Sequence, residues 1–248
     1  LEADVFHVEF KNSTIVHSLV GFVLSMLLVF RTNTAYDRWW EGRRIWGGIV
    51  NNSRNLALKL SVIVEDAATR QRFRILITNQ VMAMKWHLRK GFNINDFEES
   101  ERYPISEFKR WQHMPNAIMQ AIYREVEELH RTKKINGEQL IYLNAELQSF
   151  TDHIGACERI QKTPIPYSYS MFLKKVIFLY IFTMPIGFVV EFGYWAVVII
   201  PLVFYIFASI EVLAEEIEDP FGQDTNDLPL NRLSNTVRDN MKEIFGEV

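Results

Sequence analysis

The chain has 248 residues, of which 48% are hydrophobic and 23% charged, and its formal net charge is −3. This length allows one or two domains with a sizeable core, and the charge balance gives no global sign of nucleic-acid binding. The single cysteine, Cys157, excludes a disulfide scaffold and a zinc site made of several cysteines. The 18 Phe, 9 Tyr and 6 Trp lie largely in apolar runs, so the composition permits a membrane protein with a polar helical body.

Three apolar stretches are long enough to cross a bilayer as helices. Residues 12–30 carry no formal charge, and a helix of this length spans about 28 Å, close to one hydrocarbon thickness. We predict membrane segments at about 12–31, 167–190 and 192–211, the last two joined as a helical hairpin. The alternative is that all three are buried core helices of a soluble protein.

The basic residues that flank these stretches predict their orientation. Four arginines follow the first stretch, and two lysines that can snorkel lie near the start of the second: Arg31, Arg38, Arg43, Arg44, Lys174 and Lys175. The positive-inside tendency places these ends in the cytoplasm and the hairpin tip at Glu191 outside. Leu1 would then lie outside. We therefore expect one further membrane helix upstream, which gives four crossings.

The remaining residues, 32–166 and 212–248, are predicted to form a cytoplasmic helical body. Apolar residues recur there at helical spacing, for example Ile118, Ile122 and Val126. Residues 91–104 and 133–137 are predicted loops because they are rich in Gly, Asn, Asp and Pro. No stretch alternates like a strand, so the predicted fold class is all-α, with membrane helices that continue into a cytoplasmic bundle.

Enzyme signatures are absent from the sequence. It contains no Walker A, G-x-G-x-x-G or G-x-S-x-G motif, so we expect no enzymatic activity. One Glu-x-x-His motif occurs at Glu127–His130, whereas a di-iron bundle needs two such motifs. The other histidines are scattered without metal-ligand spacing: His7, His17, His87, His113 and His153.

Two segments next to the first membrane stretch have patterns that allow two interpretations. Phe22, Met26 and Phe30 are spaced i, i+4, i+8 and lie along one helix face, which is either a functional surface or a packing or lipid-facing stripe. Residues 31–41 contain no Gly or Pro, so the helix is predicted to run straight out of the membrane. The tryptophans of this segment, Trp39 and Trp40, are either interfacial anchors or internal packing residues.

The third distinctive segment, residues 211–229, is rich in carboxylates. Glu211, Glu215 and Glu218 share a helix face, and Pro220 is predicted to end that helix. Oxygen ligands of this kind suit a hard cation such as calcium. A solvated acidic surface is the alternative, and an EF-hand register fails because Leu228 stands where an oxygen ligand belongs.

Several motifs together resemble the bestrophin family of ion channels. The matching pieces occur in the family's order and cover nearly the whole chain: Arg38-Trp39-Trp40, Gly155-Ala156-Cys157-Glu158-Arg159-Ile160, Pro164-Ile165-Pro166-Tyr167, and Asp219-Pro220-Phe221-Gly222 followed by Asn226-Asp227. The ending at residues 226–230 is more similar to the bacterial members. The resemblance implies a single bestrophin-like domain over 1–248 and a homopentamer in the lipid bilayer of a bacterial cell, with a central pore.

The resemblance also implies roles for particular residues. The family's three neck positions, which form a hydrophobic gate, correspond to Phe22, Met26 and Phe30. Met26 departs from the usual Ile or Phe and is more flexible. A cytosolic aperture corresponds to Glu138, where the family usually has an apolar residue.

Calcium and the permeant ion follow from the same resemblance. Asp224 and Asp227 match two carboxylate positions of the calcium clasp of animal members. Calcium is therefore the one cofactor that the resemblance suggests, and we expect that the protein requires no cofactor. Animal and plant members conduct chloride and other anions, and some bacterial relatives prefer monovalent cations such as sodium. We therefore expect a passive channel for monovalent ions that does not bind nucleic acid. The alternative is a membrane-anchored scaffold or sensor with a cytoplasmic partner.

Overall fold

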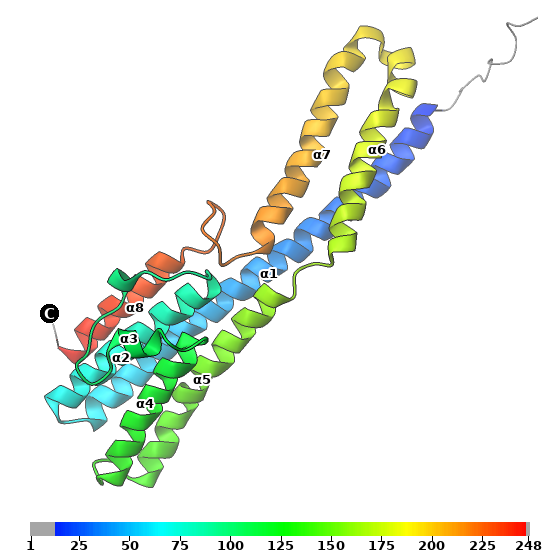
Figure 1. Ribbon diagram of the computed structural model, residues 1–248. Helices are drawn as coiled ribbons and strands as arrows, with labels where there is room; N and C mark the ends of the chain where they lie inside the picture. Colours follow the sequence, from blue (N-terminus) through cyan, green and yellow to red (C-terminus); the bar gives the residue numbers. More distant parts are fainter. Residues whose placement is uncertain (1–12, 247–248) are drawn as a thin grey trace, which may run out of the picture. The chain divides into compact units, whose positions relative to one another are not determined.

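A computed structural model describes residues 13–246, and every regular element in this range is a helix (Figure 1). The helices are α1 (Ser13–Ile63), α2 (Ala67–Leu88), α3 (Ile105–Phe108), α4 (Met114–Arg131), α5 (Gly137–Lys162), α6 (Tyr167–Phe192), α7 (Ala196–Glu218) and α8 (Leu230–Phe245), with short 3-10 helices η1 (Ile94–Asp96) and η2 (Gly193–Trp195). The predicted all-α class is confirmed. Residue 12, the predicted start of the first membrane segment, and His7 lie outside the described residues.

The chain folds as two compact units. Among the described residues, the first contains residues 13–38 together with Pro164–Glu218, and the second contains Trp39–Thr163 and residues 219–246. The predicted borders after residues 31 and 211 fall inside α1 and α7, because both helices continue beyond the apolar stretches that define them in the sequence. Helix α1 is continuous from Ser13 to Ile63 and contributes to both units.

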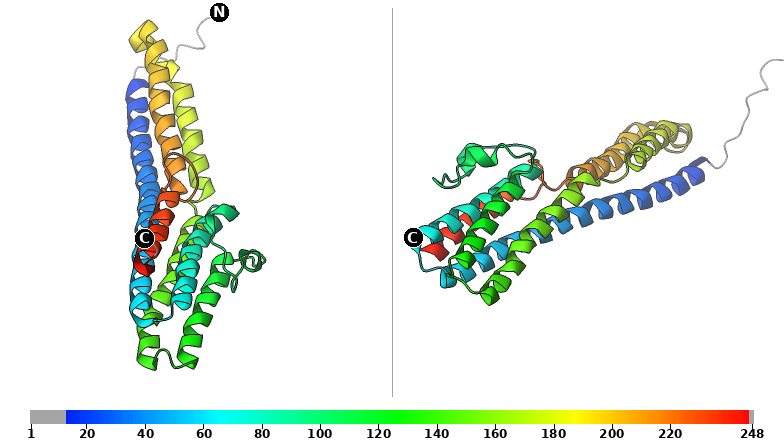
Figure 2. Two further views of the ribbon diagram at one scale, coloured as in Figure 1. Left: turned by 90° about the vertical axis from the view of Figure 1, so that its left-hand side faces the viewer. Right: turned by 60° about the horizontal axis from the view of Figure 1, so that its bottom comes forward.

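The first unit consists of the N-terminal part of α1 and the hairpin of α6 and α7. These two helices, yellow-green and orange, lie side by side in both views of Figure 2. Gly193, at φ +54°, ends α6, since this left-handed conformation suits glycine, and η2 then leads into α7. The hairpin predicted around Glu191 is thus present.

Side-chain exposure supports the membrane interpretation of the first unit. Ile15–Ile63 and Tyr167–Glu218 contain windows apolar enough to cross a membrane, and only 22% and 11% of these windows are buried. A core helix of a soluble protein would be mostly buried instead. The buried part is a small cluster between the helices: Leu24, Leu28, Leu173, Ile177, Tyr180 and Met184.

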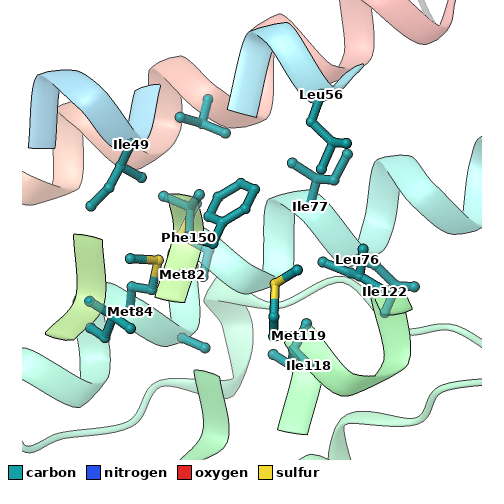
Figure 3. Packing of buried hydrophobic residues seen from close by; sticks show 14 of the residues in the cluster. Ile49, Leu56, Leu76, Ile77, Met82, Met84, Ile118, Met119, Ile122 and Phe150 are labelled. Carbon is teal, nitrogen blue, oxygen red and sulfur yellow. The ribbon is translucent and has the colours of Figure 1, made fainter. Parts of the chain in front are cut away.

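The second unit has the main hydrophobic core. Residues of α1, α2, α4 and α5 meet in it, including Ile49, Ile77, Ile118 and Phe150 (Figure 3). The predicted stripe on α4 is buried as expected from its spacing. Helix α8 packs against α2 in the same unit. This core fixes the ends of α2, α4 and α5 relative to one another.

Polar residues define where the helices of this unit begin. The Asp66 carboxylate accepts a hydrogen bond from the Thr69 backbone at the start of α2, and Asn136 and Gln139 form a reciprocal capping box on α5. The predicted loop at 91–104 contains only η1, and the loop predicted for 133–137 ends one residue early, because Gly137 already begins α5.

Candidate ion pathway and cation sites

The predicted neck residues lie on the exposed side of α1. Phe22, Met26 and Phe30 are 64%, 45% and 58% exposed, whereas Leu24 and Leu28 on the same helix are buried against α6. Three large apolar side chains therefore form an uncovered line along one face of this chain. The contacts of Leu24 and Leu28 determine which face of α1 turns outward.

A close approach of α1 and α6 holds this face in its orientation. A Cβ atom at Gly21 would lie 2.6 Å from the Tyr180 hydroxyl oxygen, so only glycine leaves room for the ring there. The Tyr169 hydroxyl donates to the Leu27 carbonyl oxygen at 3.3 Å, and His17 Nε2 lies 3.3 Å from the Thr183 hydroxyl. These contacts join the two helices along the apolar stretch.

A buried ionic cluster lies where the apolar stretch of α1 ends. The guanidinium of Arg31 is 1% exposed, and its Nη2 and Nε lie 2.7 Å from Glu218 Oε2 and 3.7 Å from Glu211 Oε2. Glu218 Oε1 also accepts the backbone N–H of Ile165 at 2.6 Å, and the Arg38 guanidinium donates to the Glu218 carbonyl. In the sequence Arg31 is recognisable only as a flanking charge, and this cluster was not predicted. The sequence signal that could have indicated the cluster is a basic residue at the end of one apolar helix and acidic residues at the end of another.

Glu138, the predicted aperture residue, is exposed in the first turn of α5. The capping box of Asn136 and Gln139 fixes the helix start on either side of it. A carboxylate at a helix N-terminus is stabilised by the helix dipole. Glu138 therefore presents a negative charge at a rigid helix end.

The Pro-Phe-Gly segment forms a closed turn in the second unit. The Phe221 side chain is fully buried, and a Cβ at Gly42 would lie 3.1 Å from its ring. The Leu228 backbone donates to the Pro220 carbonyl at 2.9 Å and closes the loop. Trp39 Nε1 donates to the Asn226 carbonyl at 2.9 Å, so packing within the protein accounts for Trp39, whereas Trp40 is 48% exposed.

The structure brings Asp224 and Asp227 together in this turn. Asp227 Oδ2 accepts the backbone N–H of Asp224 at 2.6 Å, while Asp227 Oδ1 is buried and has no hydrogen-bond partner among the described residues. Burial raises the pKa of Asp227, and the negative charge of Asp224 also raises it. The hydrogen bond from the Asp224 backbone N–H lowers this pKa but does not outweigh burial. Two carboxylates with a spare oxygen can contribute ligands to a hard cation.

A second polar cluster in the same unit was not predicted. His87 Nε2 and His113 Nε2 both lie close to Glu158 Oε1, at 2.6 and 2.8 Å, and Lys162 Nζ lies 3.0 Å from Oε2. Burial lowers the pKa of His87. Burial would raise the pKa of Glu158, but hydrogen bonds from Lys162, His87 and His113 outweigh it and lower this pKa to about 2.

Comparison with known proteins places the chain in a family. Residues 1–243 match the sequence profile described as Bacterial/Fungal Bestrophin protein. The chain belongs to the bacterial and fungal bestrophin family. The resemblance inferred from its motifs is thereby confirmed.

Curated relatives of this bestrophin include voltage-dependent anion channel-forming protein alr2987 from Nostoc sp. The two are 40% identical over 232 residues, which cover 90% of this chain and 75% of that protein. Voltage-dependent anion channel-forming protein YneE from Escherichia coli O157:H7 is 29% identical over 245 residues, which cover 97% of this chain and 80% of that protein. Both relatives are thus named as proteins that form anion channels.

The fold of this chain is also similar to that of solved bestrophin structures. The crystal structure of a bacterial bestrophin homologue from Klebsiella pneumoniae superposes with a TM-score of 0.87 at 28% identity and covers 94% of this chain and 87% of that one. Similar structures are described as those of a membrane protein, for example one at a TM-score of 0.88. The bestrophin described here is accordingly a bacterial membrane protein.

Proposed function

We propose that this bestrophin is a passive ion channel that assembles as a homopentamer in the bacterial membrane and conducts through a neck lined by Phe22, Met26 and Phe30. The observation that carries the proposal is the exposed apolar line on α1, opposite the face that packs on α6. Five copies facing one another would enclose a narrow apolar bore, and such a bore can gate ions by dewetting.

Anions are the proposed default for the permeant ion. Relatives at 40% and 29% identity are named anion channel-forming proteins. Cation conduction is the second candidate, and the exposed carboxylate of Glu138 favours it. A ring of carboxylates at the pore exit concentrates cations within about one Debye length, roughly 8–10 Å in ordinary salt.

Asp224 and Asp227 are the proposed calcium ligands. The unpartnered Oδ1 of Asp227 and the turn that holds both carboxylates support this assignment. Two carboxylates make a weak site unless backbone carbonyls or water complete the shell. We therefore propose that calcium modulates conduction and is not required for it.

The decisive experiment is current recording from purified protein in planar bilayers under a salt gradient. A reversal potential near the chloride equilibrium value supports the anion channel, and one near the sodium value supports the second candidate. Pentameric mass in detergent supports the pore arrangement. A monomer that passes no current contradicts the proposal and favours a membrane-anchored scaffold.

A further inference from the structure

Three residues far apart in the sequence bring nitrogen and oxygen ligand atoms to one point in the second unit. His87 Nε2 and His113 Nε2 approach the same oxygen, Glu158 Oε1, at 2.6 and 2.8 Å. The two imidazole centroids are 4.2 Å apart, and one ligand atom from each residue lies within 4.8 Å of the others. We propose that His87, His113 and Glu158 bind a transition-metal ion of the Zn²⁺ type. This proposal is independent of the proposed channel function.

The donor set fits such an ion chemically. Two imidazoles and one carboxylate are ligands that Zn²⁺ uses in three-ligand protein sites, with water in the fourth position. Ligand atoms around a tetrahedral zinc at about 2.1 Å are separated by roughly 3.4 Å. The present contacts are somewhat shorter and would open by less than about 1 Å as the ion entered, a change that side-chain rotation can supply.

The backbone frame around the triad is already in place. His87 lies in the last turn of α2, His113 immediately precedes α4, and Glu158 lies on α5. These three helices pack against one another in the main core. The side chains are 22%, 28% and 19% exposed, so the site is fixed by packing yet open to an ion and a water molecule.

Besides the two Nε2 hydrogen bonds to Glu158 that the ion itself would replace, two interactions would be given up when it binds. Lys162 Nζ, 3.0 Å from Glu158 Oε2, competes for the carboxylate, but its side chain is 67% exposed and can swing into solvent. His113 Nδ1 accepts the backbone N–H of Asn116 at 3.2 Å. A metal on Nε2 requires the proton on Nδ1, so this capping bond would be lost. Both costs fall on partly exposed groups.

The test uses the purified full chain in detergent, stripped of metal with a chelator. Zn²⁺ is titrated calorimetrically, and Co²⁺ replaces it as an optical probe, because tetrahedral cobalt absorbs strongly in the visible range. We expect one saturable site per chain that involves this triad. His87→Ala and His113→Ala should each weaken the affinity at least about tenfold and abolish the tetrahedral cobalt spectrum.

Matched variants separate metal binding from folding. His130→Ala removes a histidine outside the triad and should bind Zn²⁺ as the unmodified chain does. Glu158→Gln keeps an acceptor for both imidazoles but removes the charged ligand, so it should fold and still lose affinity. Zn²⁺ should raise the melting temperature of the unmodified chain and of His130→Ala, but not that of His87→Ala. Equal affinity in His87→Ala, His113→Ala and the unmodified chain, or no saturable binding at all, overturns the proposal.

Discussion

Arg31 Nη2 lies 2.7 Å from Glu218 Oε2 in the interior of the first unit, and this pair connects α1 to the end of α7. The same carboxylate accepts the Ile165 backbone N–H through its other oxygen. One glutamate therefore links α1, α7 and the segment that enters α6. Removal of Arg31 would leave both glutamates without their cation, whereas removal of Glu218 would leave Arg31 with the longer contact to Glu211.

Arg31→Ala should destabilise the protein strongly. Breaking a buried pair by deleting one partner costs about 3–5 kcal/mol, because Glu211 and Glu218 would lose the cation that compensates their burial. Thermal unfolding followed by intrinsic fluorescence in detergent measures the loss. Lys175→Ala, which deletes an exposed positive charge on α6, is the control and should change the melting temperature little. Similar melting temperatures for both variants would contradict a structural role for the pair.

Combined replacement of Phe22, Met26 and Phe30 by Ala should raise single-channel conductance. Smaller side chains would widen the apolar bore and lower the dewetting barrier. Val20→Ala, which changes an exposed residue about 80–160° around the helix from the three neck residues, should leave conductance unchanged. Unaltered currents in a correctly folded triple variant would mean that this face of α1 does not line the pore.

Glu138→Lys should shift the reversal potential toward anion preference. Reversal of a charge at the pore exit changes the sign of the local ion atmosphere. The same variant should cost roughly 0.5 kcal/mol at the N-terminus of α5, where a positive charge opposes the helix dipole. Glu107→Lys makes the same charge change at another exposed position. Equal shifts in both variants would show that net charge, rather than an aperture at Glu138, sets selectivity.

Asp224→Asn should abolish a response of the current to micromolar calcium. The substitution removes a charged oxygen ligand and leaves the backbone N–H that donates to Asp227. Current recorded with calcium and then with a chelator measures the response. Asp239→Asn, at an exposed position on α8, is the control. A current that is the same with calcium and with chelator would show that this site does not regulate the channel.

Asp96 should contribute stability that is lost in acid. Burial would raise its pKa, but hydrogen bonds from the buried Lys85 and from Trp86 outweigh this effect and lower the pKa. A depressed folded-state pKa means that the contribution is present above about pH 4 and disappears as the pH falls through the folded value. Asp96→Asn should lower stability near pH 7 by about 1–3 kcal/mol and flatten the acid limb in pH-dependent melts. A parallel acid limb in both proteins would contradict this.

Local patterns made much of the first unit predictable from the sequence. The uncharged runs required long helices, and the absence of Gly and Pro between residues 31 and 41 indicated that α1 continues, as it does to Ile63. Gly193 supplied the end of α6 through its positive φ. Helix α7 likewise continues past the apolar stretch and ends at Glu218, close to Pro220, the residue predicted to end it.

The clusters of polar side chains could not be predicted in the same way. Glu158 is 71 residues from His87 and 45 from His113, and no helical period connects such positions. Only the packing of α2, α4 and α5 brings these side chains together. Arg31, Glu211 and Glu218 likewise meet through tertiary structure, whereas Asp224 and Asp227 are close because a short turn joins them.

Cys157, the sole cysteine of the chain, is fully buried in the core of the second unit, and burial, reinforced by Glu41 and Glu158, raises its pKa to about 12. Almost no thiolate therefore exists at neutral pH, and alkylating reagents have no nucleophile to attack. The unmodified chain should therefore give no background signal in site-directed cysteine labelling. Cysteines introduced one at a time along α1 would be modified by water-soluble thiosulfonates without prior mutation of Cys157. Their labelling rates would map which helix positions are reached by water.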